Sequence, residues 1–523
     1  MTVVVPRPRT AMRFVVARPP IGFLWRRALL RAALAPLVVL APIVALAPTA
    51  DHKYNVYWHG GLFRDDPLRI VPDTLDSLPS YLRNGNFRPL GRMLEKLVDL
   101  AAYALGEVGV PANVGLRVVS IAAAMLLGVA VLVLAESVVA RGRLFRAEPS
   151  TVAAVAPFAF AAGLVAAGRS SPVVLFGGLY FTTAAVVLLV AAAIARIGRI
   201  RAWQLPLLVA AGAALAAFNE LTYLTLPLAT VAVAARGRWV LGQAWRRIGT
   251  AAPARALGAL GLGFLPVFGT VRLVIKSYCD TGPCYPASDV ALGSAVAKTF
   301  PVRLIAWFPP LEWQSAVRGG GALSGLTLAL ALAALAALAW TALRDLRRLG
   351  ALGRPAAAAL VVVALALVAL GAGLAALSAD VQHLVAAHRW GQGWRDTAVV
   401  APGGALLLAG AAHLAGPRRV LLGGLIAVLV AGCAVTATVN KRFRDTMLQS
   451  PVARLDDRLA QEVADFDPTP AGAARRCALR TEFLALNPGG RTPARRFDVS
   501  FDAAARQRAG QPFCPVTGSG QGR

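Results

Sequence analysis

Long apolar runs separated by short charged segments dominate the chain. Most runs hold about 20 residues, which is enough for an α-helix to cross the hydrocarbon core of a bilayer. The candidate spans are 28–48, 113–140, 150–168, 173–195, 203–218, 221–235, 253–273, 321–343, 355–377, 397–416 and 420–439. The pattern predicts an all-α polytopic membrane protein with about 11 transmembrane helices.

Two of these runs, 203–218 and 221–235, are short and are separated only by Asn219-Glu220. Both outer flanks of the pair are rich in arginine. We therefore interpret the pair as a helical hairpin whose tip lies on the non-cytoplasmic side.

Composition supports a membrane protein and excludes two other classes. The 523 residues are 57% hydrophobic and only 15% charged, whereas an ordinary soluble protein carries about 25% charged residues. An ordinary cytosolic enzyme and a disordered chain are both excluded by this balance. Arginine supplies 49 of the 54 basic residues, and this bias, with abundant alanine, indicates a GC-rich bacterial genome.

The net charge of +28 reflects the orientation of the chain in the membrane and does not indicate nucleic-acid binding. No basic stripe with interleaved aromatic residues is present, so we expect no nucleic-acid partner. The basic residues fall in bursts between spans, and short arginine-rich loops mark the cytoplasmic side. Beyond the N-terminus, the bursts are Arg141/Arg143/Arg146, Arg196/Arg199/Arg201, Arg236/Arg238/Arg246/Arg247, Arg344/Arg347/Arg348/Arg354 and Arg418/Arg419. If the N-terminus is cytoplasmic, all five bursts fall in cytoplasmic loops and the C-terminus lies outside.

This topology divides the chain into three parts. Residues 1–27 form a basic cytoplasmic N-terminus, 28–440 the transmembrane domain, and 441–523 an extracytoplasmic tail. The tail begins with a polar, helix-compatible stretch and ends in a segment rich in Gly, Pro and Arg with little periodicity. The outer loops of the transmembrane domain are 49–112, 274–320 and 378–396. In the first loop, Asp76–Leu82 and Gly91–Leu105 show helical spacing and suit interfacial helices.

The cysteines agree with this topology. Cys279 and Cys284 lie in one outer loop, and Cys477 and Cys514 lie in the tail. Same-side pairs in an oxidising compartment predict two disulfides. The alternative is that all four are free thiols; metal binding is disfavoured because neither pair has a second Cys or His pair at ligand spacing.

The first outer loop carries several candidate functional groups. Asp51 directly follows the first span, where a carboxylate can act as a general base for a lipid-borne substrate, although it can also simply end a helix. His59 follows as a candidate substrate ligand. Asp65 and Asp66 could hold a divalent cation such as Mg²⁺ or Mn²⁺ with substrate phosphates, and the alternative is a solvated turn before Pro67.

Further candidates lie in three other segments. The string Tyr81–Arg92 contains an Asn84-Gly85 turn, and its Arg88 suits a phosphate; interfacial snorkelling is the alternative. Glu220 is the acid at the hairpin tip, and ionisable groups near membrane depth are functional candidates. The loop 378–396 is the densest in polar groups, and we select His388, Arg389 and Arg395 as substrate-binding candidates, beside tryptophans that also suit membrane anchoring.

Several other function classes lack a signal. The chain has no Gly-rich phosphate loop and no Gly-x-Ser-x-Gly elbow. The spans hold almost no charges, and no internal repeat is visible, which weakens a transporter. Polar groups gather instead at the outer face, and this distribution favours chemistry on a lipid headgroup. A flippase for a lipid-linked saccharide and a non-catalytic scaffold remain as alternatives.

The layout resembles the GT-C class of membrane glycosyltransferases. The resemblance covers residues 28–440 and rests on the many spans, the long first outer loop, the acid after the first span and the string Gly85-Asn-Phe-Arg-Pro-Leu90. The Glu220-Leu-Thr-Tyr stretch is also similar to hairpin acids of related proteins. The chain departs from the class in lacking an Asp-x-Asp, Glu-x-Asp or Asp-Glu directly after the first span.

The resemblance implies an enzyme of the bacterial plasma membrane. Such an enzyme transfers a sugar from a polyprenyl phosphate to a glycan or lipid acceptor at the outer face. Asp51 would deprotonate or orient the acceptor hydroxyl, with Glu220 as the second catalytic candidate. Arg389, Arg395 or Arg88 would hold the charge of the lipid phosphate.

Overall fold

The computed structural model describes residues 20–49, 51–282, 284, 290–317, 323–416, 418–488 and 491–515. Most of the basic N-terminus and the last eight residues therefore lie outside the described chain. Every regular element within it is a helix, and the extended contacts are two isolated bridges, Ser150–Gly350 and Val290–Ser378. The all-helical prediction is confirmed.

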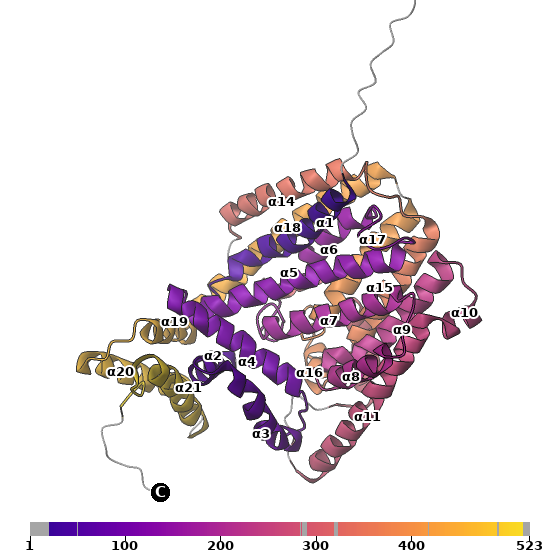
Figure 1. The fold of residues 1–523 in the computed structure, drawn as a ribbon. Helices are drawn as coiled ribbons and strands as arrows, with labels where there is room; N and C mark the ends of the chain where they lie inside the picture. The colour runs from indigo at the N-terminus through magenta and orange to yellow at the C-terminus, as the bar shows by residue number, and fades with distance from the viewer. Residues whose placement is uncertain are drawn as a thin grey trace, which may run out of the picture.

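Seven helices are long and apolar enough to cross a membrane. They are α5 (Ala112–Val139), α7 (Gly177–Arg196), α11 (Ala252–Thr281), α14 (Gly325–Asp345), α15 (Arg354–Ala376), α17 (Thr397–Ala415) and α18 (Arg419–Leu448). Their length and composition make the protein a multi-pass membrane protein in outline, and they run through one bundle (Figure 1).

Four other helices occupy the remaining predicted spans and pack within the same bundle. They are α1 (Ile21–Leu40), α6 (Val152–Ala162), α8 (Gln204–Ala216) and α9 (Thr225–Ala235). α1 packs against α5 and α6, while α8 lies along α11 (Figure 1). Each predicted apolar run therefore contains a helix, although the helix in the run 150–168 ends at Ala162 and the helical part of the run 28–48 ends at Ile43. The number of helices that cross the bilayer remains a prediction.

Glycines allow two of these helices to touch through their backbones. A Cβ on Gly212 of α8 would lie 2.0 Å from the Leu260 oxygen of α11, and one on Gly263 would lie 1.8 Å from the Val209 oxygen. Small residues at helix crossings permit this close approach, which replaces the hydrophobic driving force that lipid cannot supply. The α8–α11 pair therefore depends on both glycines.

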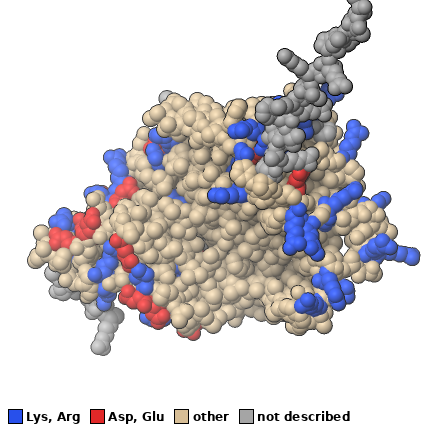
Figure 2. Space-filling view, turned by 45° about the horizontal axis from the view of Figure 1, so that its top comes forward, with Lys and Arg blue, Asp and Glu red and all other residues tan. Residues whose placement is uncertain are grey.

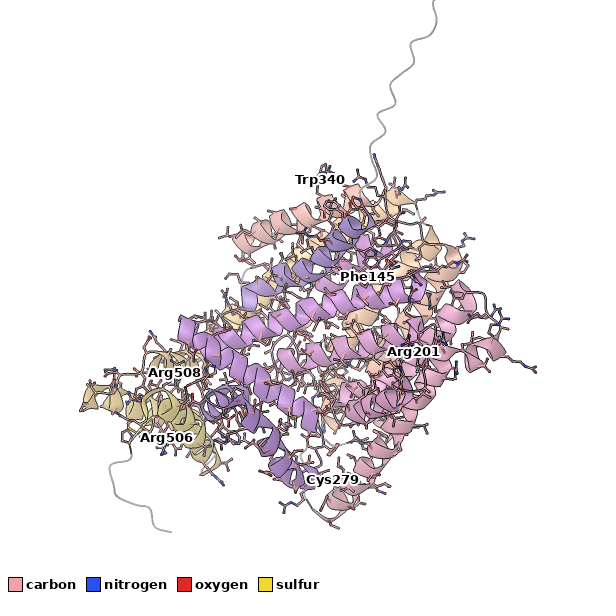
Figure 3. All side chains as sticks on the ribbon, viewed as in Figure 1. Phe145, Arg201, Cys279, Trp340, Arg506 and Arg508 are labelled. Carbon is pink, nitrogen blue, oxygen red and sulfur yellow. A yellow bond between two sulfur atoms is a disulfide. The ribbon has the colours of Figure 1, made fainter. Side chains whose placement is uncertain are left out.

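The two ends of the bundle differ in charge. Arg141, Arg196 and Arg236 come from three separate predicted bursts, yet they line one pocket. We call this the arginine end, and Arg201 lies there as well (Figure 3). At the opposite end, acidic and basic side chains are mixed, as Figure 2 shows on the left of the molecule. We call it the mixed-charge end.

Several of the connecting segments also contain helices. The segments predicted to lie outside the membrane, and the short links next to them, contain η1 (Ala41–Ile43), α2 (His52–Phe63), η2 (Pro67–Arg69), α3 (Ile70–Arg83), α4 (Pro89–Ala104), η3 (Leu105–Val108), η4 (Glu220–Leu224), α12 (Ser294–Leu304), α13 (Pro309–Ala316) and α16 (Ala379–Ala386). The arginine end carries the π-helix η5 (Arg236–Val240) and α10 (Trp245–Thr250). The two helices expected in the first outer loop are thus present as α3 and α4.

The tail folds into three helices, α19 (Pro451–Ala464), α20 (Pro470–Leu486) and α21 (Arg491–Ala509), and α21 packs on α2 (Figure 1). The expectation that the end of the tail lacks periodicity is wrong for α21. Phe497, Phe501, Ala504 and Ala505 are buried, and their spacing is that of one helix face. The arginines around them lower the average hydrophobicity and hide this stripe.

Both predicted disulfides are formed, Cys279–Cys284 and Cys477–Cys514, with Cα–Cα distances of 5.2 and 4.9 Å. Figure 3 places Cys279 at the far end of α11. The second bridge joins α20 to the segment that follows α21. The alternative of four free thiols is excluded by this pairing.

Candidate functional site

The start of α4 is pressed against the tip of the α8–α9 hairpin. The Leu90 amide donates a hydrogen bond to the Ala217 carbonyl at 3.2 Å. A Cβ on Gly91 would lie 2.2 Å from the Phe218 oxygen, so only glycine fits. Pro89 is tolerated because the first turn of a helix needs no amide hydrogen. This contact brings Arg88 beside the acid at the hairpin tip.

Glu220 forms ion pairs with two arginines from distant segments. Its Oε1 lies 3.0 Å from Nη1 of Arg395, and its Oε2 lies 3.7 Å from Nη1 of Arg88. The Arg395 guanidinium also lies over the rings of Trp394 and Tyr180, 5.2 and 5.8 Å from their centroids. We call Arg88, Glu220 and Arg395 the Glu220 cluster.

The arginines determine the ionisation of Glu220. Burial by itself would raise the pKa of this carboxyl, but the positive charges of Arg88, Arg395 and, further away, Arg272 outweigh it and lower the pKa to about 2. A carboxylate this acidic is a weak proton acceptor at neutral pH. Within the cluster, Glu220 therefore balances and orients the arginines.

Buried polar atoms without hydrogen-bond partners gather around the cluster. They are Nε of Arg88, Nε of Arg92 and Nδ2 of Asn219. Nη1 of Arg88 and Oε2 of Glu220 also make no hydrogen bond, although they face each other at 3.7 Å. Native structures leave few such atoms, and a concentration of them calls for a water, an ion or a ligand. The guanidinium and amide donors among these buried atoms suit an anionic, oxygen-rich group.

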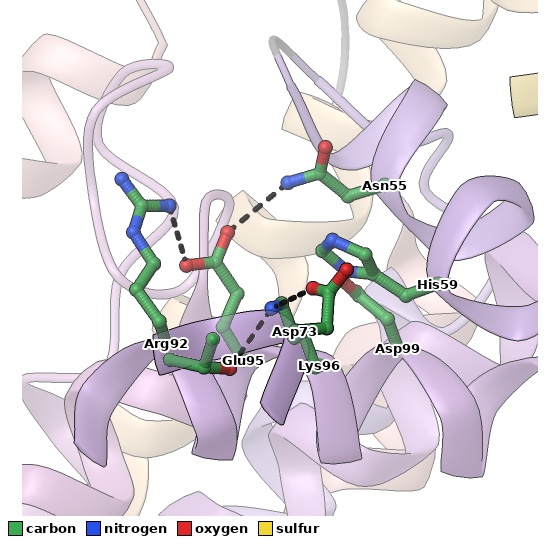
Figure 4. A network of polar contacts seen from close by, with 8 residues as sticks. Asn55, His59, Asp73, Arg92, Glu95, Lys96 and Asp99 are labelled. Carbon is green, nitrogen blue, oxygen red and sulfur yellow. Dashed lines mark hydrogen bonds and ion pairs between the residues drawn. The ribbon is translucent and has the colours of Figure 1, made fainter. Parts of the chain in front are cut away.

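A second polar network joins α2 to α4 (Figure 4). Glu95 accepts hydrogen bonds from Arg92 at 2.9 Å and from Asn55 at 3.0 Å. Lys96 donates to Asp73 of α3 at 2.5 Å. Burial would raise the pKa of Glu95, but the nearby Arg92 and Arg88 lower it, so Glu95 is held as a carboxylate.

His59 and Asp99 complete this network. Nδ1 of His59 lies 2.7 Å from Oδ2 of Asp99, and both side chains are buried. Burial raises the pKa of Asp99 to about 6, while the hydrogen bond with His59 works against that rise. The second oxygen of Asp99 has no partner. A carboxylate paired with an imidazole fixes the orientation of the ring.

The acids and bases on α4 were not selected from the sequence, apart from Arg92 within its string. Arg92, Glu95, Lys96 and Asp99 follow helical spacing and form one stripe. That stripe was available as a signal, but a polar stripe on an amphipathic helix is usually taken to face water. Here it faces α2 and α3 instead, and Glu95, Lys96 and Asp99 are buried.

Asp51 lies immediately before α2, on the side that faces the tail. Its Oδ1 accepts a hydrogen bond from Nη1 of Arg496 at 2.8 Å, and the two side chains are 48% and 56% exposed. An ion pair this exposed contributes little to stability. Asp51 is therefore a carboxylate open to solvent at the edge of α2.

The cation site expected at Asp65 and Asp66 has no further protein ligands. Both residues are exposed, and Asp65 accepts a hydrogen bond from Gln507 of α21 at 3.0 Å. In the described part of the chain, no group of three or more His, Cys, Asp or Glu side chains is placed to hold a metal ion. A cation held by these two carboxylates together with substrate phosphates stays a prediction, and no step of the proposed reaction depends on it.

The loop 387–396 contributes unevenly to the site. Trp394 and Asp396 are buried, and Asp396 accepts three hydrogen bonds from Arg303 of α12, two from Nη2 at 2.6 and 2.7 Å and one from Nε at 3.0 Å. This pair anchors the loop and so positions Arg395. His388 and Arg389 are exposed, and His388 has a φ of +55°.

The turn at Asn84-Gly85 is fixed against the first disulfide. Gly85 has a φ of +77°, and a Cβ there would lie 3.0 Å from Sγ of Cys284. Glycine adopts this left-handed conformation at no steric cost. The disulfide at the end of α11 therefore supports the loop that carries Arg88.

Comparison of the chain with protein-family models, with curated proteins and with solved structures finds no match.

Proposed function

We propose that the protein is a membrane glycosyltransferase of the GT-C type, using a sugar carried on a polyprenyl phosphate. The observation that carries the proposal is the group of buried polar atoms without hydrogen-bond partners on Arg88, Arg92, Asn219 and Glu220, at one end of an apolar bundle. If these atoms lay on a surface open to solvent, water molecules would form hydrogen bonds with them. A site that receives a phosphate and sugar hydroxyls would leave them unpaired until the substrate binds.

In this proposal Arg88 and Arg395 hold the donor phosphate. Transfer develops negative charge on that phosphate as the bond to the sugar breaks, and preorganised arginines stabilise it. Glu220 keeps the two guanidinium groups apart and oriented before substrate binds. In the same proposal His59, which is ordered by Asp99, would contact a sugar hydroxyl from α2.

Asp51 is the proposed proton acceptor. The acceptor hydroxyl loses its proton as its oxygen attacks the anomeric carbon, and the polyprenyl phosphate leaves from the opposite side, so the configuration inverts. Asp51 is an accessible carboxylate next to α2, whose other side chains form the network of Figure 4. Its exposed pair with Arg496 costs little to separate.

The proposed topology follows from the charge of the two ends. With the arginine end in the cytoplasm, the mixed-charge end faces outward, and all eleven apolar segments cross the bilayer. The Glu220 cluster then lies at the outer surface of a bacterial plasma membrane, where lipid-linked donors and envelope glycan acceptors meet. Disulfides at that end suit an oxidising compartment.

The test is sugar transfer by purified protein in liposomes with a panel of polyprenyl-phosphate sugars. We expect transfer by the native protein and loss of transfer in Asp51→Asn, with equal insertion of both. Donor movement between leaflets without any transfer would contradict the proposal and favour a flippase. Correctly inserted protein that neither transfers nor moves any donor would favour a scaffold.

A further inference from the structure

A basic pocket lies at the arginine end, opposite the Glu220 cluster. It measures about 490 Å³ and is formed where the ends of α5, α7 and α9 meet the start of α11. Its lining includes Arg141, Arg143, Arg196 and Arg236 and no acidic residue. Four guanidinium groups around one hollow favour an anion.

Two of the arginines are held in place by the C-terminal end of α5. Arg236 donates from Nη1 to the Ser137 and Val138 carbonyls at 3.0 and 3.1 Å. Arg196 donates to the Ala140 carbonyl at 2.7 Å. Carbonyl oxygens at a helix C-terminus attract cations, so these contacts fix both side chains. The carbonyls carry only partial charges, and the pocket keeps a net positive charge.

The start of α11 adds a second attraction for an anion. α11 begins at Ala252 with Pro253 in its first turn and has no side-chain cap. Ala251, Ala252 and Pro253 all line the pocket. The free amides and the positive dipole end of a 30-residue helix therefore face the same space as the arginines.

Apolar residues beside the pocket place it at the level of a lipid headgroup. Trp239, Leu241 and Trp245 are exposed, and Leu241 also lines the pocket. Exposed tryptophans are typical of the membrane–water interface. The neighbouring surface at this end carries further basic side chains (Figure 2).

We infer that this pocket binds the phosphate group of an anionic phospholipid in the leaflet at the arginine end. Arg141 and Arg143 would contact the phosphate from the loop, Arg196 and Arg236 from the bundle, and the acyl chains would lie along the exposed apolar side chains. Basic pockets between membrane helices bind anionic headgroups in this way. The site is separate from the proposed donor site and does not depend on it.

Native mass spectrometry of the protein released from nanodiscs tests the inference. The nanodiscs contain phosphatidylcholine with or without phosphatidylglycerol. We expect retained phosphatidylglycerol in the native protein and roughly a tenfold or greater loss of it in the double variant Arg141→Gln/Arg143→Gln. The control is Arg199→Gln/Arg201→Gln, which removes the same charge from the same end outside the pocket lining and should retain the lipid.

A second measurement separates a lipid phosphate from a free one. Thermal stability is recorded with phosphatidylglycerol and, separately, with inorganic phosphate in phosphatidylcholine nanodiscs. Stabilisation by the lipid alone supports the inference, whereas stabilisation by inorganic phosphate alone overturns the lipid assignment. If both double variants lost the same amount of lipid, or if the native protein did not prefer phosphatidylglycerol, the inference would be wrong. Lipid binding would then come from the general positive charge of this end and not from the pocket.

Discussion

Glu220 and Arg395 are 175 positions apart in the sequence, and their side chains form an ion pair with Nη1 and Oε1 3.0 Å apart. The hairpin tip supplies the acid and the loop before α17 supplies the base. Arg88, from the start of α4, joins the same carboxylate. Three segments that are far apart in the sequence thus converge on one charge, and this convergence supports the most direct tests of the proposed site.

Glu220→Gln is expected to lower sugar transfer by about 10- to 100-fold. Without the carboxylate, Arg88 and Arg395 face each other unbalanced and lose their orientation, and misplaced groups of this kind cost about that much in rate. Initial rates in liposomes measure the effect. Glu107→Gln is the matched control, because it breaks an exposed pair with Arg64 outside the cluster. Equal rates in both variants would argue against the site.

Asp51→Asn and Arg496→Gln remove the same exposed ion pair from opposite sides. If Asp51 accepts the proton, only the first variant loses transfer, by roughly 100-fold or more. Both should keep their stability, because such pairs contribute about 0–1 kcal/mol. The comparison of rates and of Tm separates the two roles. Equal activity losses would instead make the pair structural.

Gly91→Ala is expected to disrupt the contact between α4 and the hairpin tip. The new methyl would lie 2.2 Å from the Phe218 oxygen, which is backbone and cannot rotate away. Arg88 would shift from Glu220, and transfer would fall at least tenfold, as displacement of a positioned group implies. Gly258→Ala is the control, since that helical glycine has open space around it. An active Gly91→Ala variant would contradict the packing.

Asp456 is expected to make the docking of the tail sensitive to pH. Burial of this α19 carboxyl raises its pKa to about 7, with Asp457 adding to the rise and Lys53 opposing it. The unfolded chain releases the proton at about pH 4, whereas the folded one keeps it to about 7. The contribution of this group to stability is therefore present at low pH and is lost as the pH rises from about 4 to 7.

Asp456→Asn removes this loss. The difference in Tm between the variant and the native protein should therefore shift in favour of the variant by a few degrees between pH 5 and pH 8. Thermal unfolding at the two pH values measures the difference. Substitution of the exposed Asp66 by Asn should leave the pH dependence as it is. If the Tm of each variant differed from that of the native protein by the same amount at both pH values, the pH dependence would belong to other groups.

Removal of the Cys477–Cys514 disulfide is expected to loosen the tail. The bridge closes a loop of 37 residues, and loss of such a cross-link costs about 4 kcal/mol. Cys477→Ser/Cys514→Ser should therefore be cleaved faster by protease within α20 and α21, while the bundle stays intact. Cys279→Ser/Cys284→Ser, which opens a much shorter loop, should leave the tail resistant. Equal resistance of the tail in all forms would show that packing on α2 is sufficient.

The sequence predicted the helical class and the candidate spans from local information, and the cysteine pairing from the side of the membrane assigned to each loop. Apolar runs of membrane length can only be helical, because backbone groups in lipid must pair within the segment. The separation of arginine bursts from balanced loops also follows from position alone. The stripe of Arg92, Glu95, Lys96 and Asp99 was visible too, but spacing gives no indication of whether a polar face meets water or another helix.

The sequence by itself therefore determined that this chain forms apolar helices separated by arginine-rich and by charge-balanced segments, because both features depend on residue type and short-range order. The two disulfides were predicted from the sequence, and the structure excluded the alternative of free thiols. Only the tertiary structure decided which charges meet. It joined Glu220 to Arg395 and Arg88, turned Asp51 toward Arg496, buried His59 against Asp99, and left Arg389 exposed. Such pairings depend on how helices pack and where glycines such as Gly91 let backbones approach, and these long-range contacts are not encoded in any single segment.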